Sequence, residues 1–305
     1  MEVYNTLSAH LKNLHGERVY KISLDGGFTC PNRDGTKGYG GCIFCNERGS
    51  GEHSKTGDIK AQVESAIAVA KAKNKGNKFI AYFQNFSSTY APIEDLKRKY
   101  LDALSFDEVV GLAIATRPDC ITEEIASLIK MVAFHKTVWV ELGLQTADER
   151  LGEFINRKYT NEDYKRAVAI LHSANIPVVT HLIVGLDGEN MQSIDKSIDL
   201  VNEVKTDGVK IHSLFILKET PLAKLYLDKK FTPISREFYI KAVANILTHI
   251  IESVVVHRLT GDGEKSQILA PEWTKEKKIN LNSIKKYMLE NGLTQGCFYK
   301  GVNND

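Results

Sequence analysis

Three cysteines within one short loop are the residues of this sequence best suited to chemistry. The segment from 22 to 47 holds Cys30, Cys42 and Cys45, and it also contains six glycines and one proline. A loop with so few side chains to bury is not ordered by a hydrophobic core, so we expect a metal to order it. Thiolate groups are the usual ligands of iron–sulfur clusters and of structural zinc.

The loop alone is compatible with either structural zinc or an iron–sulfur cluster. Structural zinc takes four protein ligands, and His53, Cys120 or Cys297 would have to supply the fourth from elsewhere in the chain. A [4Fe–4S] cluster needs only three cysteines when its fourth iron binds a ligand that is not protein. Phe44, which directly precedes Cys45, would then pack beside the cluster and a bound nucleoside.

The run Cys42-Ile43-Phe44-Cys45, with a third cysteine upstream after a strand, resembles the cluster loop of radical S-adenosylmethionine (SAM) enzymes. Most members of that family place the first two cysteines closer together, whereas eleven residues separate Cys30 from Cys42 here. The longer spacing resembles the branch of the Elongator catalytic subunit, and in particular its small bacterial relatives without an acetyltransferase domain. The resemblance implies that Cys30, Cys42 and Cys45 ligate a [4Fe–4S] cluster and that SAM chelates the open iron. Reduction by a partner such as flavodoxin or ferredoxin would cleave SAM to a 5′-deoxyadenosyl radical.

The elements that position these residues alternate between strands and helices. Apolar periodicity and turn signals predict strands over 18–24, 78–84, 109–116, 137–144, 177–184, 208–217 and 254–259. Helices are predicted over 3–14, 58–73, 92–104, 122–133, 148–156, 161–174, 193–204 and 235–251. The alternation predicts an α/β fold with a parallel sheet covered by helices, and the resemblance implies a partial, open (β/α)6 barrel of the TIM type. We expect a core domain with its N-terminal helix over 1–265 and a helical C-terminal extension over 266–305.

Polar residues gather where the predicted strands end, and in parallel α/β folds ligands bind at the carboxyl ends of strands. Each of these residues, taken alone, is explained by a turn or a helix cap, but together they indicate a site for a large polar ligand. Three of the segments resemble Elongator-like radical SAM proteins: 115–119 their T-R-P-D segment, 140–146 their fourth strand, and 184–189 the glycine motif near adenine. Asp187 stands where that family usually has proline, so we expect an altered loop that still contacts adenine. Residues 258–262 also belong to the pattern of this branch.

The strand ends and the resemblance together predict ten residues that bind SAM. Glu141 is implied to reach the ribose or the methionyl part, and the backbone of Gly185 to approach adenine. The ten predicted cofactor-binding residues are Phe44, Gln84, Ser87, Ser88, Arg117, Glu141, Gln145, His181, Gly185 and Arg258. No catalytic side chain is predicted.

The composition is that of an ordinary globular protein. Of 305 residues, 43% are hydrophobic and 26% are charged, and the formal net charge of +2 predicts no strong overall field for nucleic acid or membrane. No apolar run approaches membrane-spanning length, and the first residues lack the pattern of a signal peptide. Five unevenly spaced cysteines do not predict a disulfide framework. We expect the reducing cytoplasm, which suits an oxygen-sensitive cluster.

The resemblance implies a substrate at or near the wobble uridine of transfer RNA, with formation or remodelling of a side chain at C5 of that base. Lysines of the C-terminal tail could meet RNA phosphates, although a solvated helix face explains them equally well. These lysines are Lys275, Lys277, Lys278, Lys285 and Lys286. Cations on the later strands could bind an anionic substrate or the carboxylate of SAM. They are Lys210, His212, Lys218 and Arg258.

Two alternative functions stay open at this point. One is a radical SAM enzyme that acts on a protein or a small metabolite. The other is a protein that binds an iron–sulfur cluster or zinc and has no enzymatic activity, which predicts that SAM is not cleaved.

Overall fold

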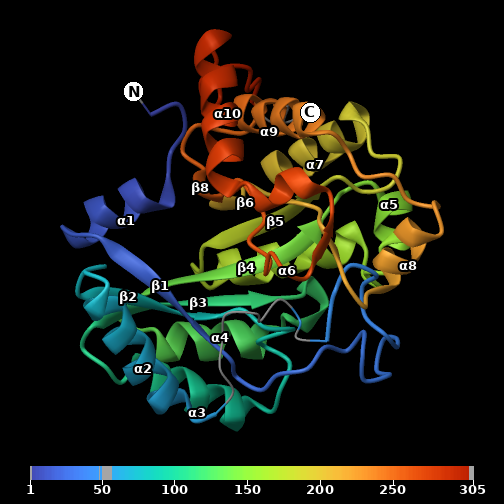
Figure 1. Cartoon of the computed structure of the whole chain (residues 1–305). Helices are drawn as coiled ribbons and strands as arrows, with labels where there is room; N and C mark the ends of the chain where they lie inside the picture. Colours follow the sequence, from blue (N-terminus) through green and yellow to red (C-terminus); the bar gives the residue numbers. More distant parts are fainter. Residues whose placement is uncertain (1, 48, 50–56, 302–305) are drawn as a thin grey trace.

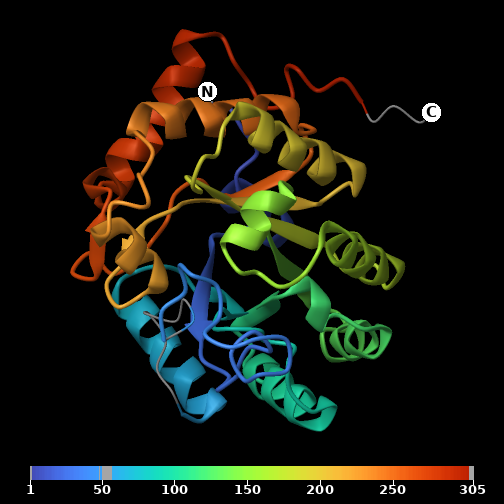
Figure 2. The ribbon, with the colours of Figure 1, turned by 90° about the vertical axis from the view of Figure 1, so that its right-hand side faces the viewer.

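The computed structural model describes residues 2–47, 49 and 57–301. Seven parallel strands form one sheet in the order β1-β2-β3-β4-β5-β6-β8. The sheet curls into an open half-barrel with helices along its outside (Figure 1 and Figure 2). The strands are β1 (Val19–Leu24), β2 (Lys78–Phe83), β3 (Val109–Thr116), β4 (Thr137–Gln145), β5 (Val178–Val184), β6 (Gly208–Ser213) and β8 (Val255–Arg258). The partial open barrel predicted from the sequence is confirmed.

Burial explains why these runs form inner strands. All residues of β3 except one are buried, and so are all residues of β2 except its first. Such strands lie between the interior of the barrel and the helices outside it, which is the usual position of strands in parallel sheets. Because the strands are parallel, their carboxyl ends lie at one edge of the sheet, and the cysteine loop follows β1 at that edge.

Ten α-helices occur in the described residues, and most begin at a capping side chain. They are α1 (Leu7–His15), α2 (Ile59–Ala72), α3 (Ile93–Leu104), α4 (Glu123–Val132), α5 (Glu149–Phe154), α6 (Asn161–Ser173), α7 (Met191–Glu203), α8 (Pro221–Leu227), α9 (Arg236–His249) and α10 (Lys277–Glu290). Thr160 shows how the sequence fixes a helix start, because its hydroxyl accepts from Asp163 N while the Asp163 carboxylate accepts from Thr160 N. Two 3₁₀ turns, η1 (Pro118–Cys120) and η2 (Glu272–Lys275), complete the set.

The predicted elements agree with the structure apart from three places. The strand predicted over 208–217 ends at Ser213, and β7 (Ile216–Leu217) instead pairs antiparallel with β9 (Ile268–Ala270). Helix α8 was not predicted, because Thr220 and Pro221 form a helix start that lies inside an expected loop. The first helix begins at Leu7, where Thr6 caps it, and not at Val3.

The C-terminal helix α10 packs on α9 (Figure 1). Ile284 and Met288 of α10 are fully buried and belong to the same hydrophobic core as the sheet. The predicted C-terminal extension thus contributes to the main core, and the domain boundary after residue 265 stays a prediction. Among the described residues, no helix combines the length and the apolar character needed to cross a membrane.

Candidate functional site

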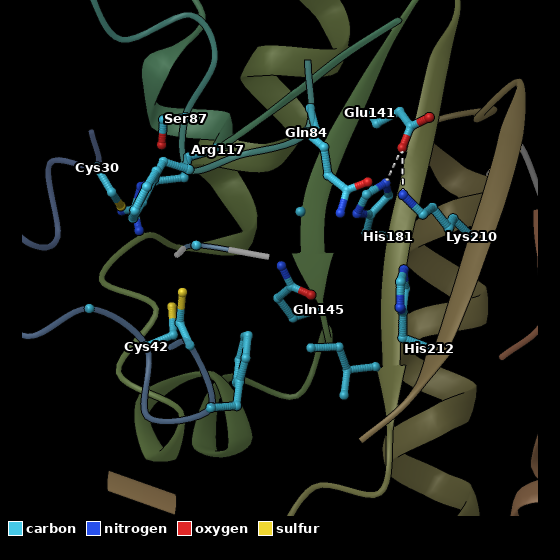
Figure 3. Close-up of a pocket in the computed structure, with 18 of the residues that line it drawn as sticks. Cys30, Cys42, Gln84, Ser87, Arg117, Glu141, Gln145, His181, Lys210 and His212 are labelled. Atoms are coloured by element: carbon cyan, nitrogen blue, oxygen red, sulfur yellow. Dashed lines mark hydrogen bonds and ion pairs between the residues drawn. The ribbon is translucent and has the colours of Figure 1, made fainter. Parts of the chain in front are cut away.

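A pocket of about 230 Å³ opens at the carboxyl edge of the sheet. Its lining contains all three cysteines of the loop and eight of the ten predicted cofactor-binding residues. These eight are Phe44, Gln84, Ser87, Arg117, Glu141, Gln145, His181 and Arg258. Figure 3 shows Cys30 and Cys42 at one side of the pocket, with Gln145 pointing between them and the opposite side. The structure thus brings together residues that lie more than 200 positions apart in the chain.

Two of the predicted residues, Ser88 and Gly185, do not line this pocket. Ser88 is fully buried, and its hydroxyl donates to the carbonyl of Asn85 at 3.3 Å. Gly185 N donates to the carboxylate of Glu189 at 2.6 Å. The neighbouring Ser87 is fully buried and does line the pocket.

The cysteine loop is held by the segment that follows α5. Asn32 Nδ2 donates to the carbonyl of Asn156 at 2.6 Å, and Asn156 Nδ2 donates in turn to the carbonyl of Gly41 at 2.8 Å. Ile43 N donates to the carbonyl of Ile155 at 3.1 Å. These bonds fix the backbone on both sides of the second cysteine, in a loop that glycines would otherwise leave free to move.

Arg157 connects this segment to the end of β4. It is 1% exposed, and its Nη1 donates to the carbonyls of Leu144 at 2.9 Å and Thr146 at 2.6 Å. The carbonyl of Arg157 accepts from Arg117 Nη1 at 2.9 Å, while Arg117 Nε and Nη2 donate to Asp119 at 2.9 Å each. Much of the Arg117 guanidinium is therefore engaged by protein. Nothing in the sequence separates Arg157 from a surface arginine, so its role was missed.

The cysteine side of the pocket suits a bound cation. Burial raises the pKa of Cys42 to about 12, with smaller contributions from Cys45 and Cys30. This thiol therefore stays protonated until a cation joins it, and iron supplies that cation when a cluster binds. Asn32 Nδ2, 3.9 Å from Cys42 Sγ, can donate to the resulting thiolate.

The three cysteines line the pocket together, and their role as cluster ligands stays a prediction. Among the described residues, no three His, Cys, Asp or Glu side chains converge closely enough to hold one metal ion. A [4Fe–4S] cluster binds each cysteine through a separate iron. Neither Cys120 nor Cys297, the other thiols considered for a zinc shell, lines the pocket. His53 lies outside the described residues.

Glu141 occupies the opposite side of the pocket and is saturated with donors (Figure 3). The carboxylate is fully buried, and it has about four lone-pair sites. Its donors are Lys21 Nζ (3.3 Å), Trp139 Nε1 (3.0 Å), Tyr82 Oη (2.7 Å), His181 Nε2 (2.8 Å) and Lys210 Nζ (2.8 Å). The carboxylate therefore holds the side chains around it in place, and its direct contact with SAM stays a prediction.

The charges of this group set its protonation. Burial alone would raise the pKa of Glu141, but the charges of Lys21 and Lys210 and the bond from His181 bring it well below its ordinary value, so Glu141 is ionised. Burial lowers the pKa of Lys210 to about 7; Glu141 opposes this shift, while Lys21 and Arg258 add to it. Burial and the charge of Lys210 lower the pKa of His181 to about 4, so its ring is neutral at neutral pH.

Lys21, Tyr82 and Trp139 were not predicted as site residues. The available signal was the two-residue period of strands, because side chains two positions apart face the same side. Trp139 lies two residues before Glu141 on β4, and Tyr82 lies two residues before Gln84 at the end of β2. Lys21 had no such partner, and only the parallel pairing of β1 with β2 brings it to the carboxylate.

Comparison with known proteins gives one consistent result. The family model described as the Radical SAM superfamily matches residues 30–201, and the model described as the Radical_SAM C-terminal domain matches residues 206–290. YtqA of Bacillus subtilis is 38% identical over 304 residues, which is 99% of this chain and 94% of YtqA. The tRNA uridine(34) acetyltransferase of Methanocaldococcus jannaschii is 30% identical over 193 residues, which is 62% of this chain but 34% of that protein. The solved structure of Elp3 from Methanocaldococcus infernus shares the fold with a TM-score of 0.69 at 18% identity, and covers 91% of this chain and 64% of its own.

Proposed function

This chain belongs to the radical SAM superfamily, and we propose that it cleaves SAM reductively at a [4Fe–4S] cluster held by Cys30, Cys42 and Cys45. Membership in this superfamily indicates an enzyme. The cluster, once bound, supplies the electron that turns SAM into a source of the 5′-deoxyadenosyl radical, and that radical abstracts hydrogen from a second substrate. The main support for this proposal is that the three cysteines line one pocket together with residues of β2, β3, β4, β5, β6 and β8.

Gln145 supports a binding role for the centre of this pocket. It adopts φ 68°, a left-handed conformation that is uncommon for a residue with a side chain, and residues in such conformations concentrate at functional sites. Figure 3 shows its amide between the cysteines and the cluster of polar residues around Glu141. We propose that Gln145, Ser87 and Phe44 contact SAM there.

We further propose that the second substrate is the wobble uridine of transfer RNA, modified at C5. The support is the similarity to the M. jannaschii tRNA uridine(34) acetyltransferase over 62% of this chain. Because the chain spans about a third of that protein, the similarity supports a shared radical step and not a shared overall reaction. A protein or a small metabolite as substrate is the competing proposal.

The first experiment is anaerobic reconstitution with iron and sulfide, followed by reduction, addition of SAM and assay of 5′-deoxyadenosine. We expect about four irons per chain and 5′-deoxyadenosine from the native protein. The triple variant Cys30→Ala, Cys42→Ala, Cys45→Ala should give neither. The matched controls Cys120→Ala and Cys297→Ala remove thiols outside the pocket and should keep both. A native protein that binds one zinc, takes up no iron and leaves SAM intact would disprove the proposal.

The substrate is tested separately on the active protein. Bulk transfer RNA should increase the rate of 5′-deoxyadenosine formation, and transfer RNA whose wobble uridine is replaced by cytidine should not. Equal stimulation by both RNAs would contradict modification of that base while leaving the radical chemistry in place.

A further inference from the structure

We propose that the pocket contains an anion-binding subsite on β6 and β8, formed by Lys210, His212 and Arg258, which receives a carboxylate or phosphate group of the second substrate. The existence of a second substrate rests on the proposed function, but the subsite itself is defined by side chains and can be tested without radical chemistry. Its ligand chemistry is a group of anionic oxygens, carried either by a small organic acid or by a nucleotide.

The three side chains come from adjacent strands and line the same pocket. Lys210 and His212 are two residues apart on β6 and therefore face the same side, and Lys210 pairs in register with Arg258 of β8. Figure 3 shows Lys210 and His212 across the pocket from Cys30 and Cys42. A ligand held by these cations would thus lie opposite the cysteines, within the same pocket.

Positive charge exceeds negative charge at this side of the pocket. Lys21, Lys210 and Arg258 accompany a single buried carboxylate, Glu141, which already binds both lysines. The other carboxylate, Asp262, is 39% exposed, lies 3.5 Å from Arg258 Nη2, and pairs more closely with a lysine of α10 at 2.8 Å. The group therefore keeps a net positive charge that an incoming anion would neutralise.

Donors remain available to such an anion. Below its pKa of about 7, Lys210 is protonated and has three N–H hydrogens. Its Nζ uses two of them, on Glu141 at 2.8 Å and on Tyr82 at 2.6 Å. The ring of His212 makes no hydrogen bond within the described residues, and its contact there is with the ring of His181 at 5.7 Å. The Arg258 guanidinium presents five N–H groups, and among the residues that the structure describes its one polar contact is long, at 3.5 Å to Asp262.

Burial makes this arrangement costly unless a ligand compensates it. The Lys210 side chain is 3% exposed and pairs with the buried Glu141, so the cost of burial falls on the positive charge in excess of that one carboxylate. Burial and the charges of Lys210 and Arg258 lower the pKa of His212 well below its ordinary value, as expected where positive charge is in excess. A carboxylate or phosphate would convert this repulsion into charge-assisted hydrogen bonds.

The test is calorimetric titration of the cluster-loaded protein at about pH 6, below the pKa of Lys210. It is done without SAM or reductant and at low ionic strength, with inorganic phosphate in one arm and acetate in the other. We expect saturable binding in at least one arm, weakened about tenfold in Lys210→Met and in Arg258→Gln, because each removes a charge-assisted donor. Lys218→Gln is the matched control, since Lys218 is exposed on the segment after β6 but does not line the pocket, and it should bind as the native protein does. Tighter phosphate binding assigns the group to a nucleotide, and tighter acetate binding assigns it to an organic acid.

If Lys210→Met does not fold, Arg258→Gln decides alone, because its side chain is 25% exposed and is not part of the buried ion pair. The proposal is overturned if neither anion binds saturably, or if Lys218→Gln weakens binding as much as the other two variants do. It is also overturned if Lys210→Met and Arg258→Gln bind the anion as the native protein does but need about ten times more SAM for half-maximal cleavage. The last result would assign these cations to SAM. If the native protein binds the anion but does not cleave SAM, the anion subsite stands and the proposed radical chemistry fails. The two failures are therefore distinguishable.

Discussion

Replacement of Glu141 by Gln tests whether this carboxylate holds the buried cations of the pocket. Glu141 is 0% exposed and Lys210 is 3% exposed, so water cannot replace either partner, whereas Lys21 at 22% exposure keeps some hydration. The loss of one partner of a buried ion pair costs about 3–5 kcal/mol because the other charge stays buried alone. Gln also turns an N–H group toward the donors Tyr82 and His181. We expect the free energy of unfolding to fall by about 3–5 kcal/mol and the melting temperature by roughly 6–10 °C.

The assay is urea and thermal unfolding of the native protein, Glu141→Gln, Lys210→Met and the double variant. Replacement of both partners of a buried ion pair by uncharged groups is often neutral, so the double variant should regain most of the loss, and a double-mutant cycle measures the coupling. Glu237→Gln, which removes an exposed pair with Lys241 on α9, is the matched control and should unfold with the native protein. A Glu141→Gln variant as stable as the native protein, or a double variant less stable than both single variants, would refute this reasoning.

Three further perturbations have distinct expected outcomes. Arg157→Met leaves the carbonyls of Leu144 and Thr146 without their buried donor. Urea unfolding should show that the free energy of unfolding falls by about 2–4 kcal/mol, and reconstitution should yield less iron per chain. The exposed control Arg166→Met should change neither quantity. Gly111→Ala places a Cβ 2.4 Å from the Thr137 carbonyl oxygen and should cost about 1–3 kcal/mol; unchanged stability would contradict the pairing of β3 with β4. Burial raises the pKa of Glu189 from 4.5 to about 7, so the unfolded chain releases this proton first and stability falls as pH rises from about 4.5 to about 7. Glu189→Gln should remove that slope from melting temperatures measured across this range, and an unchanged slope would exclude Glu189 as its source.

The sequence was sufficient for the succession of strands and helices along the chain and for the class of fold. Strand runs such as Val109–Thr116 are apolar on both faces and are separated by helices with clear capping residues, so each element could be recognised locally. The rule that ligands bind at the carboxyl ends of parallel strands then placed distant polar residues in one site. This explains why Gln84, Gln145 and Arg258, which no local pattern connects, could be expected to line one pocket, as they do.

The sequence was insufficient where contacts depend on packing between distant loops. The bonds that join Asn32 to Asn156 and Arg117 to Arg157 cross 124 and 40 residues respectively, and no periodicity reports such pairs. The saturation of Glu141 is of the same kind, because its five donors come from β1, β2, β4, β5 and β6. A glutamate at a strand end predicts an acceptor, but only the assembled barrel shows that its lone pairs are already used.

The presence of the buried cation Lys210 on β6 is more easily explained by ligand binding than by a contribution to the stability of the fold. A fold gains little from a buried ion pair, since apolar residues of similar volume in its place are often neutral or stabilising, and the core around this pocket is otherwise apolar enough to accept them. Glu141 compensates Lys210, yet Lys21 and Arg258 leave the group positive, so the carboxylate reduces the cost of burial without removing it. Sites that keep such a cost usually serve binding or chemistry. A double variant Glu141→Gln, Lys210→Met that folds stably but no longer binds phosphate or acetate would separate the two explanations, because the fold would then be shown not to need the charge that the ligand requires.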